Sequence, residues 1–236
     1  MLLYLKSMNE VHLTNQKKLN PADPGQPNRF LSRRFDDALR YAADAHRFQK
    51  RKSAPSVGGR PKPLQIPYIG HLIGVASIVI DAGGSEDEAI AAVLHDAPED
   101  QGGRSRLDDI SAVFGERVAE IVLGCTDSLA TDPGQKAPWR QRKERYIAHL
   151  KASTDLSVYL VSAADKCHNA RATARDLAFA SDPQEVWSKF NPGRDGTLWF
   201  YRSLVDVFLS GPPDDRRDLI VSDLQRAVKE MEASRS

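Results

Sequence analysis

Residues 92–103, "AVLHDAPEDQGG", place His95, Asp96, Glu99 and Asp100 within six positions at the end of an apolar segment. Four titratable side chains so close together are costly to bury unless an opposite charge neutralises them. A bound cation would provide that charge. The stretch therefore predicts a metal site at the end of a buried helix, and the remaining ligands have to come from elsewhere in the chain.

The segments before this stretch have the pattern of helices. Ser85 and Glu88 form a capping box ahead of "AIAAVLHD", and Pro98 limits how far that helix continues. The preceding segment "HLIGVASIVIDA" (71–82) predicts a second helix that ends at two glycines. An amphipathic helix is predicted further upstream by a stripe of residues at helical spacing: Phe35, Ala38, Leu39, Ala42 and His46.

The segments that follow are helical as well. The first reads as two helices separated at Gly115, and the patterns cover 107–127, 139–152, 155–179, 196–210 and 214–233. No segment has the alternation typical of a strand. We predict one all-α domain over residues 31–236, preceded by a flexible, polar and proline-rich N-terminal extension, 1–30.

Composition excludes several classes of protein. A net charge of +1 argues against the basic surface of a nucleic-acid-binding protein, so any attraction for anions has to be local. The two cysteines, Cys125 and Cys167, form no CxxC pair, which excludes a zinc ribbon and suits a reducing compartment. We find no signal peptide and no run of membrane-spanning length. We expect a cytoplasmic protein with no membrane or nucleic-acid partner, and the sequence indicates no oligomeric state.

Four residues on three separate helical patterns are candidate metal ligands: His71, His95, Asp96 and Asp165. Two imidazoles and two carboxylates without a thiolate suit Mn²⁺, Fe²⁺ or Zn²⁺ and leave positions for water and a substrate oxygen. Glu99 and Asp100 could position or deprotonate that water. Taken singly, each residue is more often structural, since a lone histidine on an apolar helix usually packs. The ordered combination favours a metal site.

The order H…HD…D resembles the signature of the HD-domain metal-dependent phosphohydrolases. More specifically, the chain resembles the hydrolase domain of the Rel/Spo alarmone enzymes and their stand-alone relatives, the small alarmone hydrolases. The stretches that carry the resemblance span roughly residues 35–205: "AADAHRFQKRKS" (42–53), "PYIGH" (67–71), "AAVLHDAPED" (91–100), "LDDISAVFGERVAEIVLGCTD" (107–127) and "SAADKCHNAR" (162–171). The HDxxED and ADKxHN elements are specific to this branch of the superfamily.

This resemblance implies a single helical HD-domain bundle and a role for each matching residue. His71, His95, Asp96 and Asp165 would hold one Mn²⁺, and Glu99 with Asp100 would serve the hydrolytic water. Arg51, Lys52 and Ser53 match the family's substrate-binding Arg-Lys-Ser, in which the guanidinium would stack on a purine and the basic pair would meet phosphate, and Asn169 would contact the sugar. The expected substrate is a purine nucleotide with a 3′-diphosphate. The expected reaction is hydrolysis of (p)ppGpp to pyrophosphate and GDP or GTP, without the synthetase activity of the longer enzymes.

The sequence departs from the family pattern at three places. Leu72 follows the first metal histidine where the family usually has proline, and Ala172 replaces an expected threonine, with Thr173 one step later. A glycine- and proline-rich insert, 54–66, carries Arg60 and Lys62 and reads as a mobile flap or as a plain linker. The missing threonine puts one hydroxyl contact to the substrate in doubt.

Other features leave alternatives open. A second basic stretch, 135–146, could cover a polyanion through Arg140, Lys143 and Arg145, although a solvated face is favoured for some of them. We expect the three tryptophans to pack rather than stack on substrate. Because Arg51 stacks on any purine, (p)ppApp or NADPH are alternative substrates. A nucleotide sensor without turnover is a third hypothesis, which the complete set of catalytic positions argues against.

Overall fold

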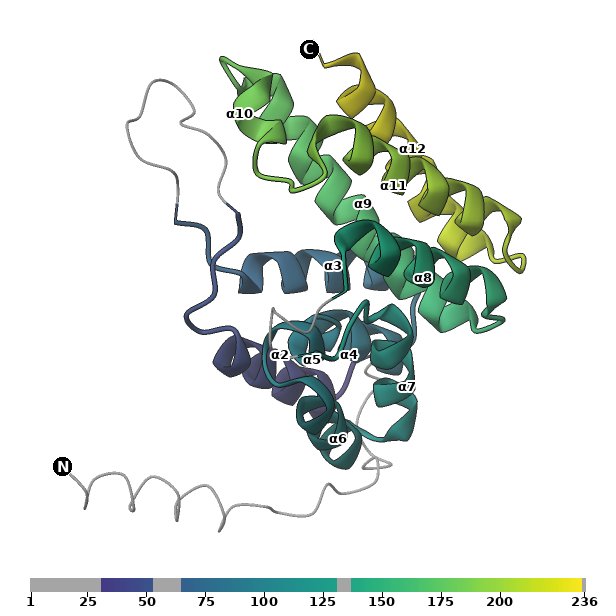
Figure 1. The fold of residues 1–236 in the computed structure, drawn as a ribbon. Coiled ribbons are helices and arrows are strands. Elements are labelled where there is room, and N and C mark those ends of the chain that lie inside the picture. The colour runs from purple at the N-terminus through teal and green to yellow at the C-terminus, as the bar shows by residue number, and fades with distance from the viewer. Residues whose placement is uncertain (1–30, 53–64, 131–136, 235–236) are drawn as a thin grey trace, which may run out of the picture. The chain divides into compact units, whose positions relative to one another are not determined.

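The computed structural model describes residues 31–52, 65–130 and 137–234. Within these ranges the regular structure is helical, and β contact is limited to an isolated bridge between Lys50 and Pro67 (Figure 1). The predicted all-α fold is confirmed. The predicted N-terminal extension 1–30 and all but the last two residues of the 54–66 insert lie outside the described residues.

The helices follow the predicted order closely. In chain order they are α2 (Arg33–Ala45), α3 (Ile69–Asp81), α4 (Glu86–Leu94), α5 (Ala97–Asp100), α6 (Gly103–Phe114), α7 (Glu116–Cys125), α8 (Trp139–Ala152), α9 (Leu156–Phe179), α10 (Pro183–Trp187), α11 (Gly193–Ser210) and α12 (Asp215–Ala233). None of the helices in the described ranges is both long and apolar enough to cross a membrane.

Local chemistry sets several of these boundaries. The predicted capping box is present: Glu88 donates its backbone N–H to the Ser85 hydroxyl at 3.3 Å, and Ser85 donates its own to the Glu88 carboxylate at 2.6 Å. The predicted break at Gly115 is also present, with φ at 98°, a conformation that glycine adopts without strain. Both boundaries are therefore encoded by short-range contacts.

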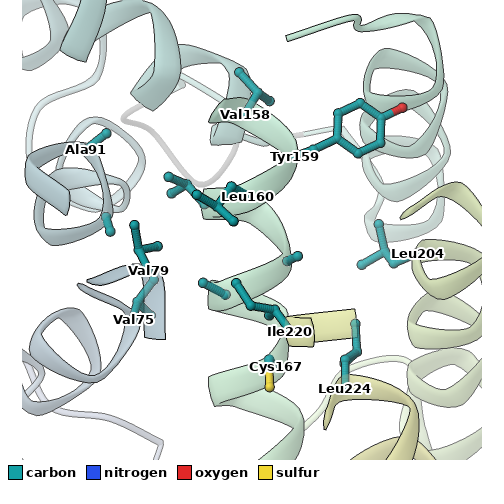
Figure 2. Packing of buried hydrophobic residues seen from close by; sticks show 14 of the residues in the cluster. Val75, Val79, Ala91, Val158, Tyr159, Leu160, Cys167, Leu204, Ile220 and Leu224 are labelled. Atoms are coloured by element: carbon teal, nitrogen blue, oxygen red, sulfur yellow. The ribbon is translucent and has the colours of Figure 1, made fainter. Parts of the chain in front are cut away.

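Helix α9 is the central helix, and several of the other helices pack against it. It contacts α12 on one side and α3, α4 and α7 on the other (Figure 1). Figure 2 shows Leu160 of α9 in the cluster of buried side chains that also includes Val79 of α3 and Ile220 of α12. A helix buried around so much of its circumference reads as apolar on several faces, which explains the strand-like "LSVYLVSAA" at its start.

The structure differs from the prediction at two places that matter later. Helix α4 ends at Leu94, so His95 and Asp96 form a junction before the separate short helix α5. The single continuous helix that we expected through these residues is wrong. Helix α10 was not predicted because five residues are too few to show a period, although it buries Trp187.

Candidate metal centre and substrate cleft

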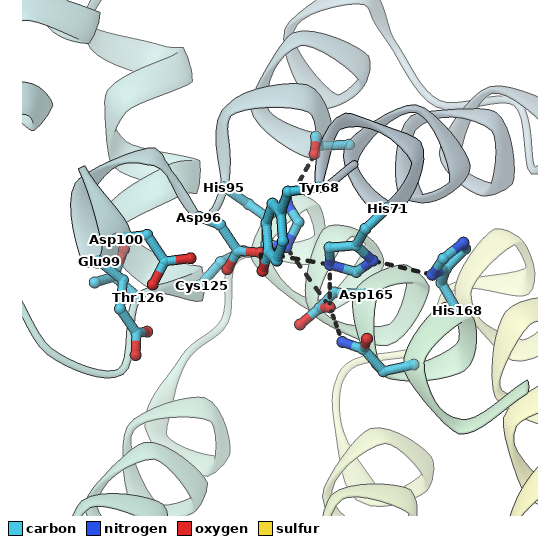
Figure 3. A network of polar contacts seen from close by, with 12 residues as sticks. Tyr68, His71, His95, Asp96, Glu99, Asp100, Cys125, Thr126, Asp165 and His168 are labelled. Carbon is cyan, nitrogen blue, oxygen red and sulfur yellow. Dashed lines mark hydrogen bonds and ion pairs between the residues drawn. The ribbon is translucent and has the colours of Figure 1, made fainter. Parts of the chain in front are cut away.

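The four candidate ligands come from different elements and meet at one point. His71 lies in the first turn of α3, His95 and Asp96 lie at the α4–α5 junction, and Asp165 lies in α9 (Figure 3). Ligand atoms of His71, His95 and Asp96 lie within 4.8 Å of one another. Asp165 Oδ1 lies 3.2 Å from His71 Nε2 and 3.6 Å from His95 Nε2. The structure thus brings together all four predicted ligands.

The orientation of His95 suits a metal ligand. Its Nδ1 lies 2.8 Å from the Ala92 carbonyl oxygen, which only accepts, so Nδ1 donates and Nε2 of the neutral ring is an acceptor. That Nε2 is buried without a hydrogen-bond partner and lies 3.1 Å from Asp96 Oδ2. Nitrogens of two imidazoles and oxygens of two carboxylates face one point, so the cluster needs a positive charge, which a proton or a metal can supply. The residues present therefore fit a divalent metal held by nitrogen and oxygen.

Electrostatics give the same result. Burial alone lowers the pKa of His95, but the Asp96 and Asp165 carboxylates raise this pKa well above its usual value. Burial raises the pKa of Asp96, but the facing His95 holds this pKa well below its usual range. Lys166 and His71 do the same for the pKa of the buried Asp165. The raised pKa of His95 favours a proton on this ring whenever no metal is bound.

Three neighbouring residues fix the carboxylates of the cluster. Tyr68 donates its hydroxyl to Asp96 Oδ2 at 2.6 Å, and its own pKa is raised by burial and by Asp96, so the donor keeps its proton. Lys166 and Asn169 each donate to a different oxygen of Asp165, at 2.5 and 2.6 Å. Sequence reasoning missed Tyr68 and Lys166, although both belong to the quoted stretches "PYIGH" and "SAADKCHNAR".

Glu99 and Asp100 lie in α5, directly after the Asp96 ligand (Figure 3). Both line the same cleft as His71. The Asp127 backbone N–H donates to Glu99 Oε2 at 3.4 Å, and Gln49 donates its side-chain N–H to Asp100 Oδ2 at 2.7 Å. These contacts hold the two carboxylates on the wall of the cleft that His71 also lines. That Glu99 and Asp100 position or deprotonate the attacking water stays a prediction.

The predicted nucleotide-binding residues lie at the base of the insert. The chain enters and leaves the insert side by side, because Arg51 N–H donates to Ile66 O and Tyr68 N–H donates to Gln49 O, both at 3.0 Å. The Arg51 guanidinium donates to Asn169 Oδ1 at 2.8 Å, so two of the predicted contacts meet. Lys52 donates to the backbone oxygen of Lys189 at 3.2 Å. Ser53 lies outside the described residues.

A cleft of about 1210 Å³ joins these groups. Among the described residues that line it, nine are lysine or arginine and four are carboxylates: Lys50, Arg51, Lys52, Arg142, Lys143, Lys166, Arg171, Arg175 and Lys189 against Asp81, Glu99, Asp100 and Asp176. A concave surface with this excess of cations attracts a polyanion. The expectation that anion attraction would be local in a chain of net charge +1 is consistent with this lining.

The second basic stretch divides between cleft and surface. Lys143 lines the cleft beside Arg142, and both pair with the carboxylate of Asp127. Burial and Lys166 lower the pKa of Lys143. Arg140 instead lies over the Trp199 ring, with its guanidinium carbon 3.3 Å from the centroid, and Arg145 is exposed. The stretch therefore contributes Lys143 as predicted, together with Arg142, which the prediction did not single out.

The tryptophans pack, as expected. Trp187 is buried, and Trp139 contacts both Trp199 and Phe200 edge to face, with centroids 6.1 and 6.0 Å apart. Trp139 also lines the cleft, which its sequence position did not indicate.

The two departures that fall in the described residues have structural consequences. Leu72 is fully buried, so the position after His71 serves the core. Ala172 lines the cleft and supplies no hydroxyl, while Thr173 donates its hydroxyl to the Asn169 backbone oxygen at 3.0 Å. The shifted threonine therefore caps its own helix turn and does not replace the missing group.

Two cysteines and a histidine of α9 are uncharged at neutral pH. Burial raises the pKa of both thiols, Cys125 and Cys167, to about 11, so neither is a nucleophile at neutral pH. Burial, His71 and Arg51 lower the pKa of His168 to about 4, so this imidazole is neutral at neutral pH.

Comparison with known families finds a match over most of the chain. A family model described as HD domain matches residues 38–198. The guanosine-3′,5′-bis(diphosphate) 3′-pyrophosphohydrolase MESH1 of Xenopus tropicalis is 33% identical over 156 residues, which cover 65% of this chain and 77% of that protein. Its counterpart in Drosophila melanogaster is 30% identical over 144 residues, covering 60% of this chain and 70% of the relative.

Longer proteins and solved structures also match. The bifunctional (p)ppGpp synthase/hydrolase SpoT of Escherichia coli is 30% identical over 141 residues, 59% of this chain but only 18% of SpoT. A solved metazoan ortholog of SpoT that hydrolyses ppGpp has a TM-score of 0.60 and 26% identity, covering 84% of this chain and 97% of its own. A Listeria monocytogenes structure has a TM-score of 0.58 and 28% identity, covering 70% and 97%.

Proposed function

The chain belongs to the HD-domain family, and on that premise we propose that it is a metal-dependent hydrolase that removes the 3′-diphosphate from (p)ppGpp. The observation that carries the proposal is the cleft itself. It runs from Arg51 and Asn169 to His71, which belongs to the cluster of two histidines and two aspartates, and lysine and arginine side chains lie along its walls. The products would be pyrophosphate and GDP or GTP.

The charge and size of the cleft support a nucleotide with more than one phosphate group. About 1210 Å³ exceeds what a single phosphate needs, and the excess of lysine and arginine matches the negative charge of two diphosphates. Arg51 is suited to the purine because its planar, weakly hydrated guanidinium stacks on aromatic rings. Lys52 and Lys143 are suited to phosphate as point charges.

We propose Mn²⁺ as the metal, held by His71, His95, Asp96 and Asp165. A mixed set of imidazole and carboxylate ligands without thiolate favours Mn²⁺, Fe²⁺ or Zn²⁺ over a structural zinc, and the family resemblance favours manganese among these. When bound, the metal would polarise the phosphate and lower the pKa of the attacking water. Tyr68 and Lys166 would keep the ligating carboxylates in place through their hydrogen bonds.

Glu99 and Asp100 would align the attacking water and accept its proton. Water would attack the phosphorus bound to the 3′ oxygen, the bond between them would break, and the 3′ oxygen would take up a proton. The lysines and Arg142 of the cleft would offset the charge that builds up on the diphosphate. The chain itself would thus supply mainly orientation and electrostatic stabilisation.

The first test is a parallel incubation of Mn²⁺-loaded protein with ppGpp, ppApp and NADPH, with products separated by anion exchange. We expect pyrophosphate from ppGpp, no turnover with Asp96→Ala, and lost turnover with a retained fold for Glu99→Gln. Orthophosphate in place of pyrophosphate would contradict the assigned bond cleavage. Absence of turnover on all three substrates would favour the sensor hypothesis.

A second candidate substrate is supported by one observation. Ala172 lines the cleft where a hydroxyl was expected, and the neighbouring Thr173 uses its hydroxyl within the helix. A cleft altered at the substrate-facing wall could prefer an adenine nucleotide such as (p)ppApp, or NADPH. Turnover of only these substrates in the same experiment would select this candidate.

We also propose that the protein acts in the cytoplasm on a freely diffusing nucleotide. Both cysteines are free thiols, which suits a reducing compartment. A nucleotide substrate with several phosphates is itself too polar to leave the aqueous phase.

A further inference from the structure

His168 is half-buried beside the candidate metal cluster and was not part of the predicted site. It lies in α9, and Figure 3 shows it on the far side of His71 from Asp96. Its Nδ1 lies 2.9 Å from Nδ1 of His71 and 3.1 Å from Nη1 of Arg51. One ring nitrogen therefore joins a predicted metal ligand to the predicted purine-stacking residue.

The chemistry of the three groups decides which nitrogens carry protons. A guanidinium only donates, so Nδ1 of His168 has to be the unprotonated, accepting nitrogen of its ring. His71 then donates its Nδ1–H to the same lone pair. This leaves Nε2 of His71 unprotonated, and Nε2 is the atom that faces Asp96 and Asp165 at 3.4 and 3.2 Å. The arrangement holds His71 in the tautomer that a metal requires.

The position of His168 depends on a glycine in the neighbouring helix. A Cβ on Gly74 of α3 would lie 2.3 Å from Nε2 and 2.5 Å from Cδ2 of His168. No real side chain tolerates such distances, so the ring fits only because residue 74 is glycine. Gly70, one turn earlier in α3, has no heavy atom within 4 Å of such a Cβ. The space at Gly74 is therefore specific to this imidazole.

A second connection runs in parallel. Arg51 donates through Nη2 to Asn169 Oδ1, and Asn169 donates through Nδ2 to Asp165 Oδ1. The two ends of the Arg51 guanidinium thus reach two different candidate ligands, each through one residue of α9. Movement of Arg51 would therefore alter the hydrogen bonds of His168 and Asn169, which contact His71 and Asp165.

We propose that His168 is a positioning residue that sets the tautomer and orientation of His71 for the metal and links the metal site to Arg51. This inference rests on the proposed function only for the identity of the nucleotide. The hydrogen bonds that carry it concern metal binding, which can be measured without any substrate.

The experiment uses two amides that place their acceptor differently. In His168→Asn the side-chain oxygen takes the position of Nδ1, whereas in His168→Gln it reaches the position of Nε2, away from His71. We expect Mn²⁺ alone to bind His168→Asn within about threefold of the unaltered protein and His168→Gln about 10–100-fold more weakly, as for other residues that orient a metal ligand. Mn²⁺ affinity would be read by electron paramagnetic resonance of the free ion.

A glycine pair tests the same idea without altering His168. Gly74→Ala has to displace the imidazole, while Gly70→Ala adds the same methyl group to the same helix in open space. We expect Gly74→Ala to weaken Mn²⁺ binding as His168→Gln does, and Gly70→Ala to leave it unchanged. Equal Mn²⁺ affinity in both alanine variants, or in both amide variants, would overturn the proposal.

Kinetics separate positioning from general damage. At saturating Mn²⁺ we expect kcat of His168→Gln to return to within about threefold of the unaltered enzyme, because the defect lies in metal retention. A loss of kcat that persists at saturating Mn²⁺ would overturn the proposal. If no substrate is turned over by the unaltered protein, the proposed function fails, and the Mn²⁺ measurements still decide the role of His168.

Discussion

At the scale of single residues, the state of His95 dominates the metal centre. Its Nε2 faces two carboxylates and its Nδ1 donates to a carbonyl, so Nε2 is the nitrogen that either a proton or a metal can occupy. Asp96 and Asp165 raise the pKa of His95 well above its usual value, against the effect of burial. Proton and metal therefore compete for one nitrogen.

This competition predicts a proton released on metal binding. Since the pKa of His95 is raised, the ring is protonated at neutral pH, and Mn²⁺ has to displace that proton. Affinity for Mn²⁺ should rise with pH, by about tenfold per unit, until the pKa of metal-free His95 is passed. Calorimetry at neutral pH in two buffers of different ionisation enthalpy would count the protons. A heat that does not depend on the buffer would contradict the prediction, and so would an activity profile that is flat between about pH 5 and 8.

Tyr68 provides a second prediction at this scale. Its hydroxyl donates to Asp96 Oδ2 at 2.6 Å, and its ring stacks on His46 with centroids 5.2 Å apart. Tyr68→Phe keeps the ring and removes the hydrogen bond, so we expect Mn²⁺ affinity to fall by about tenfold while the thermal midpoint of the metal-free protein changes little. Tyr41→Phe, which removes a hydroxyl that contacts Asp109 and Arg106 away from the cluster, is the control and should leave Mn²⁺ affinity unchanged.

At the scale of elements, the start of α9 has a titratable cap. The Asp155 carboxylate accepts a hydrogen bond from Ser157 N–H at 2.9 Å. It also accepts hydrogen bonds from Nη1 and Nη2 of Arg117, at 2.7 and 2.8 Å. The Arg117 hydrogen bonds hold the pKa of Asp155 below its usual value. A carboxylate with a depressed pKa in the folded state stabilises above its unfolded pKa, and this contribution is lost as pH falls through the folded value.

We therefore expect Asp155→Asn to lower stability at neutral pH and to remove part of the acid sensitivity. The amide can still cap α9 but cannot pair with Arg117, so the loss should be within about 1 kcal/mol, the range for a partly exposed ion pair. Asp155→Ala should lose about 1 kcal/mol more because the cap is also removed. Urea unfolding at pH 7 and pH 3 measures both. A difference between the unaltered protein and Asp155→Asn that stays constant between these pH values would contradict the assignment.

The elements also show how far the sequence predicts the structure. Signals within one helix were sufficient for the Ser85 capping box, the Gly115 break and the full extent of α8. The junction at His95 and Asp96 was missed because Pro98 was expected to end a helix, whereas proline is also tolerated in the first turn of a new one. That local choice depends on tertiary contacts, since both junction side chains turn toward α3 and α9.

At the scale of the whole molecule, the sequence predicted which candidate ligands cluster but not which residues hydrogen-bond to them. The order of the four candidate ligands, His71, His95, Asp96 and Asp165, can be read directly from the sequence. Tyr68 and His168 contact cluster residues that lie 28 and 97 positions away along the chain. Such partners follow from the packing of α3 against α4 and α9, and no periodicity within either segment indicates them.

The cleft as a whole predicts a dependence on ionic strength. Salt screens the attraction between its cations and a polyanion, with a Debye length of about 10 Å at 0.1 M and about 3 Å at 1 M. KM for ppGpp should therefore rise with salt while kcat changes less. Arg142→Gln removes one charge from the cleft wall and should raise KM at low salt by about three- to tenfold, as expected for one partly screened charge.

Arg145→Gln is the matched control for this charge. Arg145 lies on the same helix, α8, but is exposed and does not line the cleft, so the same substitution there should leave KM unchanged. If attraction of the substrate depended on the net charge of the protein alone, both variants would raise KM equally, because each lowers the net charge by one. Unequal effects at low salt that converge at high salt would show that attraction depends on where the charges lie. This is the result expected for a protein whose net charge is only +1.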